Sequence, residues 1–157
     1  MAAPIAKPRS TASCDQASIS EALMRVGLRP TRARCGILAH LLGSDVHPNA
    51  EEITAGLRSD GIAVGVATVY QNLNKLADAG LVHRLAGPDG RTRFDADLSD
   101  HDHIVCDSCV KVRDFDLAPA SRHALHRAAA GDAATGSWLI SRTTIELHGL
   151  CPECRAH

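Results

Sequence analysis

Four cysteines in two CxxC pairs have the most specific chemistry in this sequence. Cys106 and Cys109 form the first pair, and Cys151 and Cys154 form the second. Thiolate sulfur is a soft ligand, and two such pairs are typical of a structural zinc site with four cysteine ligands. The 41 residues between the pairs exceed the usual ribbon spacing, so the ion would join two distant segments. The alternative is that the cysteines are small buried apolar residues.

Histidines and carboxylates near the first CxxC pair suggest a second metal site. If residues 101–106 form a strand, His101 and His103 point to one face, because side chains alternate along a strand with a period of two. Several Asp residues lie between positions 95 and 114. The alternative is a pair of surface histidines on a strand. We expect two metals of different character in one small protein.

Length and composition indicate one medium domain or two small ones in 157 residues. Only four residues are aromatic, so the core must consist of Leu, Val, Ile and Ala. No apolar run approaches about 20 residues, so we expect no membrane span. The N-terminus lacks the apolar segment of an export signal, which predicts a cytoplasmic protein. In that reducing compartment the CxxC pairs favour metal over disulfides.

Charge differs between the two parts of the chain. Residues 1–94 carry 11 Lys and Arg against 8 Asp and Glu, a balance of +3. Residues 95–157 carry 6 against 10, a balance of −4. The first part could therefore face phosphates, whereas the second is rich in oxygen ligands.

Three short helices are predicted in the first part of the chain. Ser18 with Glu21, and Asn49 with Glu52, have the spacing of capping boxes. Glycines follow the apolar-periodic residues and are expected to end the helices. The predicted helices run from Ser18 to Gly27, from Thr31 to Gly43 and from Asn49 to Gly61.

A fourth helix and a hairpin are predicted next. Residues 66–79 place apolar side chains on one face at helical spacing, and a glycine follows. Two β-prone runs, 81–86 and 91–95, flank the turn sequence Asp89-Gly90. Short helices followed by a hairpin are the order of a winged helix. Its fourth helix would read the major groove of DNA.

The remaining residues predict a small second domain of mixed structure. Its expected elements are strands at 101–106 and 110–115, a helix at 119–130, and one long strand or two short ones within 137–148. The fold class is therefore α/β (α+β). The predicted layout is a disordered tail (1–17), a winged-helix domain (18–95), a hinge (96–100) and a metal-binding domain (101–157).

Together these segments resemble the ferric uptake regulator family over nearly the whole chain. The matching segments, in order, are residues 27–34, 47–48, 66–73, 79–82, 93–95, 101–109 and 149–154. The resemblance implies a homodimeric, metal-dependent repressor of transcription, not an enzyme. It also implies that the second domain is a dimerisation domain and that the four cysteines hold a structural zinc.

The peroxide-responsive branch of the family is the most similar. In that branch the sensing metal is bound by three His and two Asp, which match His47, Asp95, His101, His103 and Asp114. The iron-sensing branch usually has Glu in place of both Asp residues. The zinc-sensing branch usually has a Cys near the first Asp, and none is present here. Five nitrogen and oxygen ligands suit Fe²⁺ or Mn²⁺ better than a thiolate-loving ion.

A further metal site found in some family members is not expected here. Two of its ligand positions match Ser121 and Thr143, which lack the Glu and His side chains used elsewhere. Asp100 and Asp102 are the carboxylates that remain. The sequence therefore predicts two metals per subunit.

The resemblance also implies DNA contacts in the first domain. They are Thr68, Tyr70, Gln71 and Lys75 on the fourth helix, and Arg29 and Arg34 near the second helix. Arg29 matches a basic residue that enters a narrow A·T minor groove, and the ring of Tyr70 could pack on a thymine methyl. The expected partner is an A/T-rich, palindromic operator duplex.

The resulting hypothesis is a repressor that senses peroxide through oxidation of a ligand histidine. One alternative is a manganese or iron uptake regulator without peroxide chemistry. Another is a non-haem metalloenzyme, but such centres need open positions for substrate, and five protein ligands leave little room. A zinc-stabilised interaction module would leave the winged-helix segment unexplained.

Overall fold

The computed structural model describes residues 15–87, 89–99, 101–132, 136–140 and 143–156. Most of the predicted N-terminal tail therefore lies outside the described residues. The chain divides into two compact units, residues 1–99 and 100–157, and each is described by itself. Within the described residues, every helix is too short or too polar to cross a membrane.

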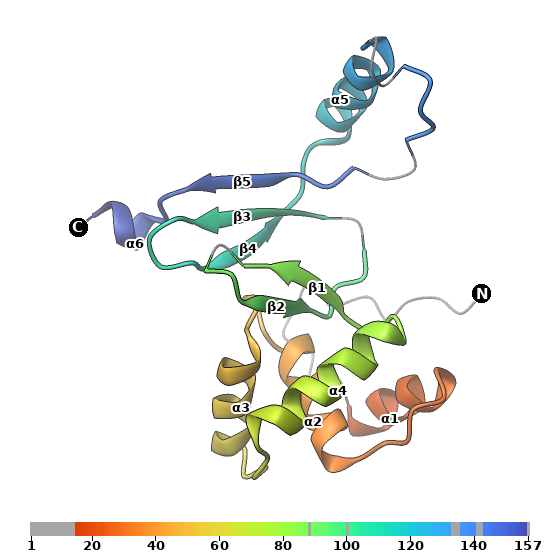
Figure 1. Cartoon of the computed structure of the whole chain (residues 1–157), viewed down its shortest axis with the longest axis vertical. Helices are drawn as coiled ribbons and strands as arrows, with labels where there is room; N and C mark the ends of the chain where they lie inside the picture. Colours follow the sequence, from red (N-terminus) through yellow and green to blue (C-terminus); the bar gives the residue numbers. More distant parts are fainter. Residues whose placement is uncertain (1–14, 88, 100, 133–135, 141–142, 157) are drawn as a thin grey trace. The chain divides into compact units, whose positions relative to one another are not determined.

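Four helices make up most of the first unit, as predicted. They are α1 (Gln16–Arg25), α2 (Arg32–Leu42), α3 (Ala50–Ser59) and α4 (Val66–Asp78) (Figure 1). The predicted capping box of α3 is confirmed, because the Asn49 side chain accepts from the Glu52 N–H while the Glu52 carboxylate accepts from the Asn49 N–H. Helices α1, α3 and α4 are each followed by a glycine with positive φ, at positions 27, 61 and 80.

The predicted start of the first helix is wrong. Helix α1 begins at Gln16, two residues before Ser18, and Asp15 is its N-cap. The Asp15 carboxylate accepts a hydrogen bond of 2.6 Å from the Ser18 N–H. Ser18 is thus the third helical residue and donates to the cap, so its pairing with Glu21 is not a capping box.

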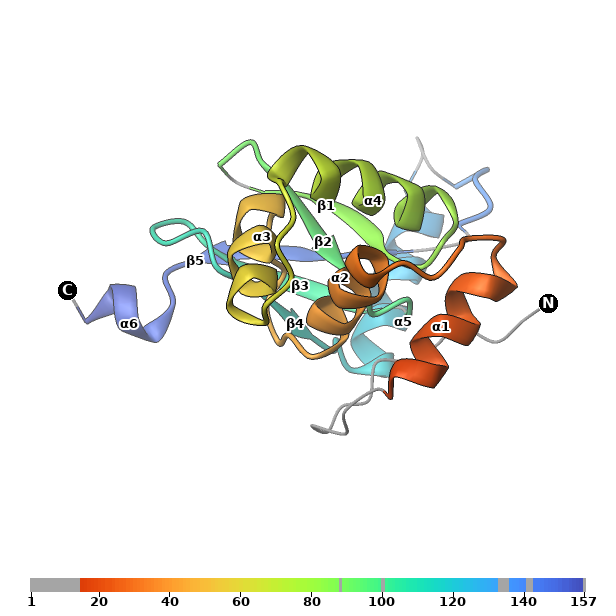
Figure 2. The ribbon, with the colours of Figure 1, turned by 90° about the horizontal axis from the view of Figure 1, so that it is seen from below.

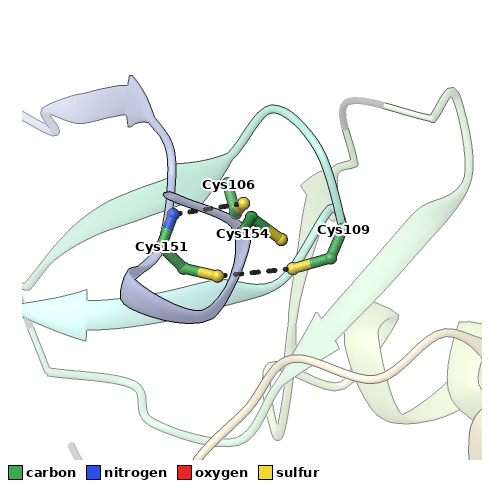
Figure 3. A group of neighbouring side chains, drawn as sticks. All are labelled: Cys106, Cys109, Cys151 and Cys154. Atoms are coloured by element: carbon green, nitrogen blue, oxygen red, sulfur yellow. Dashed lines mark hydrogen bonds between the residues drawn. The ribbon is translucent and has the colours of Figure 1, made fainter. Parts of the chain in front are cut away.

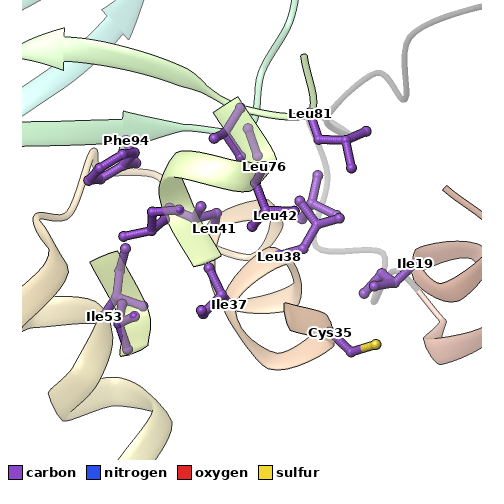
Figure 4. Packing of buried hydrophobic residues seen from close by; sticks show 14 of the residues in the cluster. Ile19, Cys35, Ile37, Leu38, Leu41, Leu42, Ile53, Leu76, Leu81 and Phe94 are labelled. Atoms are coloured by element: carbon purple, nitrogen blue, oxygen red, sulfur yellow. The ribbon is translucent and has the colours of Figure 1, made fainter. Parts of the chain in front are cut away.

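The core of the first unit lies between these helices and the hairpin that follows. Val69, Leu73 and Leu76 lie on one face of α4 and are fully buried. Figure 4 shows Leu76 beside Leu41 and Leu42 of α2. Helix α4 packs on α2 and α3 (Figure 2). Each such side chain contributes roughly 1.5–3 kcal/mol when it leaves water. The inward face of α4 therefore fixes which of its residues point to solvent.

The hairpin that forms the wing is confirmed. Strand β1 (His83–Ala86) pairs with β2 (Thr92–Asp95) in antiparallel register, with His83 opposite Asp95. Gly90 has a φ of +75°, a conformation that glycine adopts without strain at the turn. Arg93 also forms an isolated bridge with Asn49, which joins the loop before α3 to the wing.

A three-stranded sheet forms the centre of the second unit. Strand β3 (Asp102–Cys106) lies between β4 (Val112–Phe115), its antiparallel partner, and β5 (Glu146–Gly149), its parallel partner. Helix α5 (Pro119–Gly131) lies in the connection from β4 to β5, and α6 (Pro152–Arg155) follows β5. The mixed sheet and helices give the predicted α/β (α+β) class.

The strand structure predicted for residues 137–148 is too long. Only Glu146–Gly149 is a strand, whereas residues 137–140 and 143–145 are not; residues 141 and 142 lie outside the described residues. Leu139 is 95% exposed, and no strand in the described part of the chain pairs with its segment. Alternating apolar residues form a strand only where a neighbouring strand accepts their hydrogen bonds.

The second unit has a small apolar core. Among its described residues only Val105, Cys106 and Val112 are buried hydrophobic side chains. Helix α5 buries none of its residues, and Trp138 is 72% exposed. Apolar burial alone is a weak source of stability for a unit of this size, so other interactions must contribute.

Candidate metal centres

Pairing of β3 with β5 brings the two CxxC pairs together. Cys106 is the last residue of β3 and lies opposite Gly149 of β5. Cys109 follows in the turn after β3, while Cys151 caps α6 and Cys154 lies within it. The four thiols face one another from these two segments (Figure 3). The parallel β3–β5 register therefore closes a site whose halves are far apart in sequence.

The sulfur positions fit one tetrahedral zinc ion. The four Sγ atoms all lie within 4.8 Å of one another, and those of Cys109 and Cys151 are 3.8 Å apart. Four Zn–S bonds of about 2.3 Å in tetrahedral geometry separate the sulfurs by about 3.8 Å. The five described cysteines are all free thiols; the fifth, Cys35, is buried in the core of the first unit, and Cys14 lies outside the described residues.

The ionisation of these thiols depends on their neighbours. The backbone N–H groups of Cys109 and Cys151 lower the pKa of the Cys106 thiol to about 6. The Glu153 carboxylate is the main cause that raises the pKa of Cys151 to about 12. Cys106 is therefore a thiolate at neutral pH, whereas Cys151 gives up its proton when a cation arrives. Zinc binding at this site is thus coupled to proton release.

Val110, the residue after the first CxxC pair, has a strained backbone conformation. Val110 has a φ of +54°, a left-handed conformation that is unfavourable for a β-branched side chain. Val110→Gly should raise the free energy of unfolding of the zinc-bound protein by about 1 kcal/mol, after the larger unfolded-state entropy of glycine is subtracted. Urea denaturation with zinc present measures the change. A lower midpoint in the variant would contradict this reading of the turn.

His47 and Asp95 form the first half-set of candidate regulatory ligands, both within the first unit. His47 lies in the loop before α3, and Asp95 ends β2. Their side chains are 1% and 2% exposed, and His47 Nε2 lies 3.3 Å from Asp95 Oδ2. The other carboxylate oxygen accepts a hydrogen bond of 2.8 Å from the Asp97 N–H. That bond orients the carboxylate so that Oδ2 faces the imidazole.

His101, His103 and Asp114 form the second half-set, all within the second unit. His103 lies opposite Asp114 in the β3–β4 register, and His101 immediately precedes β3. The two Nε2 atoms are 3.0 Å apart. Asp114 Oδ1 lies 3.6 Å from Nε2 of His101 and 3.8 Å from Nε2 of His103. The predicted common face of the two histidines is therefore confirmed.

The distances within the second half-set fit one metal ion bound by His101, His103 and Asp114. Two metal–nitrogen bonds of about 2.1 Å at a right angle place the nitrogens about 3.0 Å apart, as in the second half-set. A hydrogen bond between the imidazoles would give a similar distance, but it would not require a carboxylate oxygen beside both rings. Neutral imidazole and carboxylate are the donors that Fe²⁺ and Mn²⁺ accept.

Asp102 is engaged by protein groups rather than directed toward the histidines. It lies between them in sequence, so its side chain points to the opposite face of β3, where it is fully buried. It accepts from the backbone N–H groups of Leu117 and Ile145 and forms an ion pair with Arg122. Burial opposes its ionisation, but the Ile145 N–H and the Arg122 guanidinium outweigh burial and lower its pKa.

Protein groups therefore satisfy Asp102, and the absence of a further metal site stays a prediction. The guanidinium of Arg122 supplies the positive charge beside Asp102 and also donates to the Thr143 carbonyl. The Thr143 hydroxyl lies 2.5 Å from the His126 imidazole. Asp100 lies outside the described residues.

The candidate DNA contacts of the first unit lie mostly on exposed surface. Thr68, Gln71 and Lys75 of α4 are exposed, as is Arg29. Tyr70 is half-buried and packs against the core. Arg34 is also half-buried, and its guanidinium donates to the Arg29 carbonyl over 2.8 Å. These two residues thus have structural contacts in addition to any contact with DNA, and the assignment of all six stays a prediction.

Two arginines near the half-sets were not identified as functional from the sequence. Arg93 contacts the His47 loop, and Arg122 contacts Asp102. A buried arginine leaves no local signal in a sequence, because its carboxylate partners can lie anywhere in the chain. The only indication for Arg93 is its place in β2, two residues before the candidate ligand Asp95.

Comparison with known proteins gives one consistent result. The sequence model of the ferric uptake regulator family matches residues 25–137. The peroxide-responsive repressor PerR of Staphylococcus aureus strain Mu50 is 35% identical over 136 residues, which are 85% of this chain and 86% of that protein.

Solved structures of the same family share the fold. The Vibrio cholerae ferric uptake regulator has a TM-score of 0.70 and 31% identity, and the match covers 84% of this chain and 98% of that one. The Pseudomonas aeruginosa ferric uptake regulator, solved with manganese, has a TM-score of 0.66 and 28% identity, with 84% and 96% covered. The similarity therefore includes both units.

Proposed function

The chain belongs to the ferric uptake regulator family, and we propose that it is a peroxide-sensing, metal-dependent repressor that binds DNA as a homodimer. The observation that carries the proposal is the pair of His/Asp half-sets. Both carboxylates are Asp, as in the peroxide-responsive branch that the sequence resembles. The Staphylococcus aureus relative is named as a peroxide-responsive repressor. A repressor acts where the operator is, so the proposal includes a cytoplasmic location.

One regulatory ion per subunit would be held by both half-sets. His47 and Asp95 belong to the first unit, and His101, His103 and Asp114 to the second. An ion shared by ligands on two units restricts the orientations that the units can adopt. It thereby shifts the population toward the form that binds DNA. Fe²⁺ and Mn²⁺ suit these five nitrogen and oxygen donors, and zinc suits the four cysteines.

The second unit is the part that would form the homodimer. Its described residues expose Trp138, Leu139 and Leu147, while its apolar core is small. Where exposed apolar side chains form a contiguous patch, a partner usually covers them. A second copy that covers them would also place two α4 helices on one duplex. Two-fold symmetry of the protein then predicts a palindromic operator.

The first unit would read that operator with α4 and the residues near α2. The proposed contacts are Thr68, Tyr70, Gln71, Lys75, Arg29 and Arg34. Side chains at the start of α4 would reach base edges in the major groove. Arg29 is exposed and would enter a narrow minor groove, which favours an A/T-rich sequence. Lys75 and Arg34 would bind phosphates, which add affinity without specificity.

Peroxide would end repression by modifying a ligand. If these residues hold Fe²⁺, the ion would lend one electron to cleave the O–O bond of peroxide next to the coordinating imidazoles, and it would recover that electron when the ring is oxidised. His47 or His101 would then gain one oxygen atom at a ring C–H bond, and the second oxygen of the peroxide would leave as water. An oxidised imidazole is a poor ligand, so the two units lose their common ion and the DNA-binding form is depopulated.

Treatment of the Fe²⁺ and Mn²⁺ forms with peroxide tests this proposal. We expect brief exposure of the Fe²⁺ form to add one oxygen to a peptide that contains His47 or His101 and to abolish binding to a duplex selected by the Mn²⁺ form. The Mn²⁺ form should keep both peptides unmodified and remain bound. Mass spectrometry and fluorescence anisotropy on the same samples measure the two effects. The tryptic peptide that contains His83, which lies outside both half-sets, is the internal control.

Other outcomes would identify a different sensor. Loss of binding through cysteine oxidation and zinc release, with both histidines intact, would place the sensor at the thiolate site. Metal-stimulated binding that persists in the peroxide-treated Fe²⁺ form would favour a manganese or iron uptake regulator. A metalloenzyme is not supported, because this family consists of transcription regulators.

A further inference from the structure

Arg93 is a buried arginine in the wing, two residues before the candidate ligand Asp95. Its side chain is 6% exposed. Its Nη1 donates to the His47 carbonyl over 3.0 Å and lies 3.4 Å from Glu52 Oε2. Its Nη2 lies 3.5 Å from Asp89 Oδ2. One guanidinium therefore contacts the loop that carries a candidate metal ligand, the first turn of α3 and the tip of the wing.

Each of these three contacts is connected to further structure. Glu52 Oε2 also accepts the Asn49 N–H in the capping box of α3, and α3 packs on α4. The Asp89 carboxylate accepts the Arg91 N–H and so shapes the hairpin turn. A shift of the His47 backbone would therefore move the Arg93 side chain, and with it the groups that it contacts in the wing and in α3, the helix that packs on α4.

The surroundings of Arg93 leave it little freedom. A Cβ added at Gly87 would lie 2.6 Å from the Arg91 carbonyl oxygen and 3.1 Å from Arg93 Nε. Glycine is therefore needed at the base of the turn, where the backbone also lies close to the guanidinium. The adjacent Phe94 N–H donates to the Pro48 carbonyl over 3.1 Å, which holds the His47 loop along β2. Arg93 Nε itself is buried without a hydrogen-bond partner among the described residues. Burial of an N–H group without a hydrogen bond costs free energy, which is unusual for a residue that serves only to stabilise the fold.

We infer that Arg93 is the positioning residue through which metal binding at His47 is transmitted to the wing and to α3. This inference rests on the proposed function. Metal binding fixes the His47 side chain, the His47 carbonyl fixes the guanidinium, and the guanidinium fixes Asp89 and Glu52. The planar fork of arginine can contact these groups at once, whereas lysine offers a single point charge. Arg93→Lys therefore keeps the charge and removes the connection.

Thermodynamic linkage gives this inference a specific readout. If Arg93 only stabilised the fold, its replacement would weaken operator binding equally with and without metal. If Arg93 transmits the metal state, its replacement lowers the ratio between the two affinities. The same ratio describes how much the operator tightens metal binding, because coupling is reciprocal.

The experiment compares operator affinity in Mn²⁺ and in chelator, by fluorescence anisotropy with the full zinc-bound chain. The wild-type ratio is expected to be about 5- to 150-fold, the usual range of coupling between sites. Arg93→Lys should reduce this ratio to about twofold or less. Asp89→Asn keeps the turn acceptor for Arg91 but loses the ion pair with Arg93, so it should give an intermediate ratio in a folded protein.

Arg91→Gln is the matched control, because it removes a charge from an exposed arginine at the same end of β2. It should leave the ratio at the wild-type value. An unchanged ratio in both Arg93→Lys and Asp89→Asn would overturn the inference. A wild-type ratio of one would instead refute the proposed function, and with it the premise of this inference.

Discussion

Cys151→Ser should release one zinc ion per subunit and unfold most of residues 100–157. The buried hydrophobic residues of that unit, among those described, are only Val105, Cys106 and Val112. Binding of structural zinc to four thiolates is worth roughly 10–16 kcal/mol in small domains and is coupled to folding. Without the ion, no interaction of comparable strength joins β3 to α6 among the residues that the structure describes. Zinc content by mass spectrometry, near-UV circular dichroism and analytical ultracentrifugation measure the loss of metal, packing and dimer.

Cys35→Ala is the control for this prediction. It removes a buried thiol from α2, in the core of the first unit, and should leave the zinc content unchanged. The helices of the first unit have their own core, so Cys151→Ser should keep much of the helical far-UV signal. A zinc-free Cys151→Ser protein with native near-UV signal and an intact dimer would refute a structural role for the metal.

His47→Ala should abolish metal-stimulated DNA binding without loss of zinc. The imidazole contributes one nitrogen from the first unit, and its removal leaves Asp95 as the only member of the first half-set. The stimulation by Mn²⁺, expected at about 5- to 150-fold in the wild type, should fall to about one. Anisotropy titration of the operator duplex, with and without Mn²⁺, gives the ratio. A His47→Ala variant that responded to Mn²⁺ as the wild type does would rule out His47 as a ligand of the regulatory ion.

His40→Ala is the corresponding control, since His40 lies on α2 in the same unit but outside both half-sets. Its ring packs close to Gly56 of α3, so a modest loss of stability is expected. The stimulation by Mn²⁺ should stay at the wild-type value. A similar loss in both variants would mean that the effect of His47→Ala comes from destabilisation of the first unit.

Local sequence patterns were sufficient to predict most of the helices, the two CxxC pairs and the common face of His101 and His103, whereas His47, Asp95 and Asp114 were assigned from the family resemblance. The capping box of Asn49 and Glu52 and the glycines after the helices depend on groups within a few residues, so their spacing is informative. The common face of His101 and His103 follows from the period of a strand. The CxxC pairs are recognisable because zinc needs four sulfurs, whichever strands bring them together.

Interactions with distant partners could not be predicted in the same way. The start of α1 depends on which of several acceptors captures the Ser18 N–H, and Asp15 does so. The apolar alternation of residues 137–148 suggested strand, but only the part opposite β3 has a partner. The contacts of Arg93 span 46 residues of sequence, so no local pattern indicates them.

A double-mutant cycle on His47 and His103 tests the central claim, that one ion is shared by both half-sets. The measurement is the ratio of operator affinities in Mn²⁺ and chelator for the wild type, His47→Ala, His103→Ala and the double variant. If one ion needs both histidines, each single variant loses the whole stimulation and the double variant loses no more. If each single variant keeps part of the stimulation and the losses add, the half-sets bind separate ions and the claim is wrong.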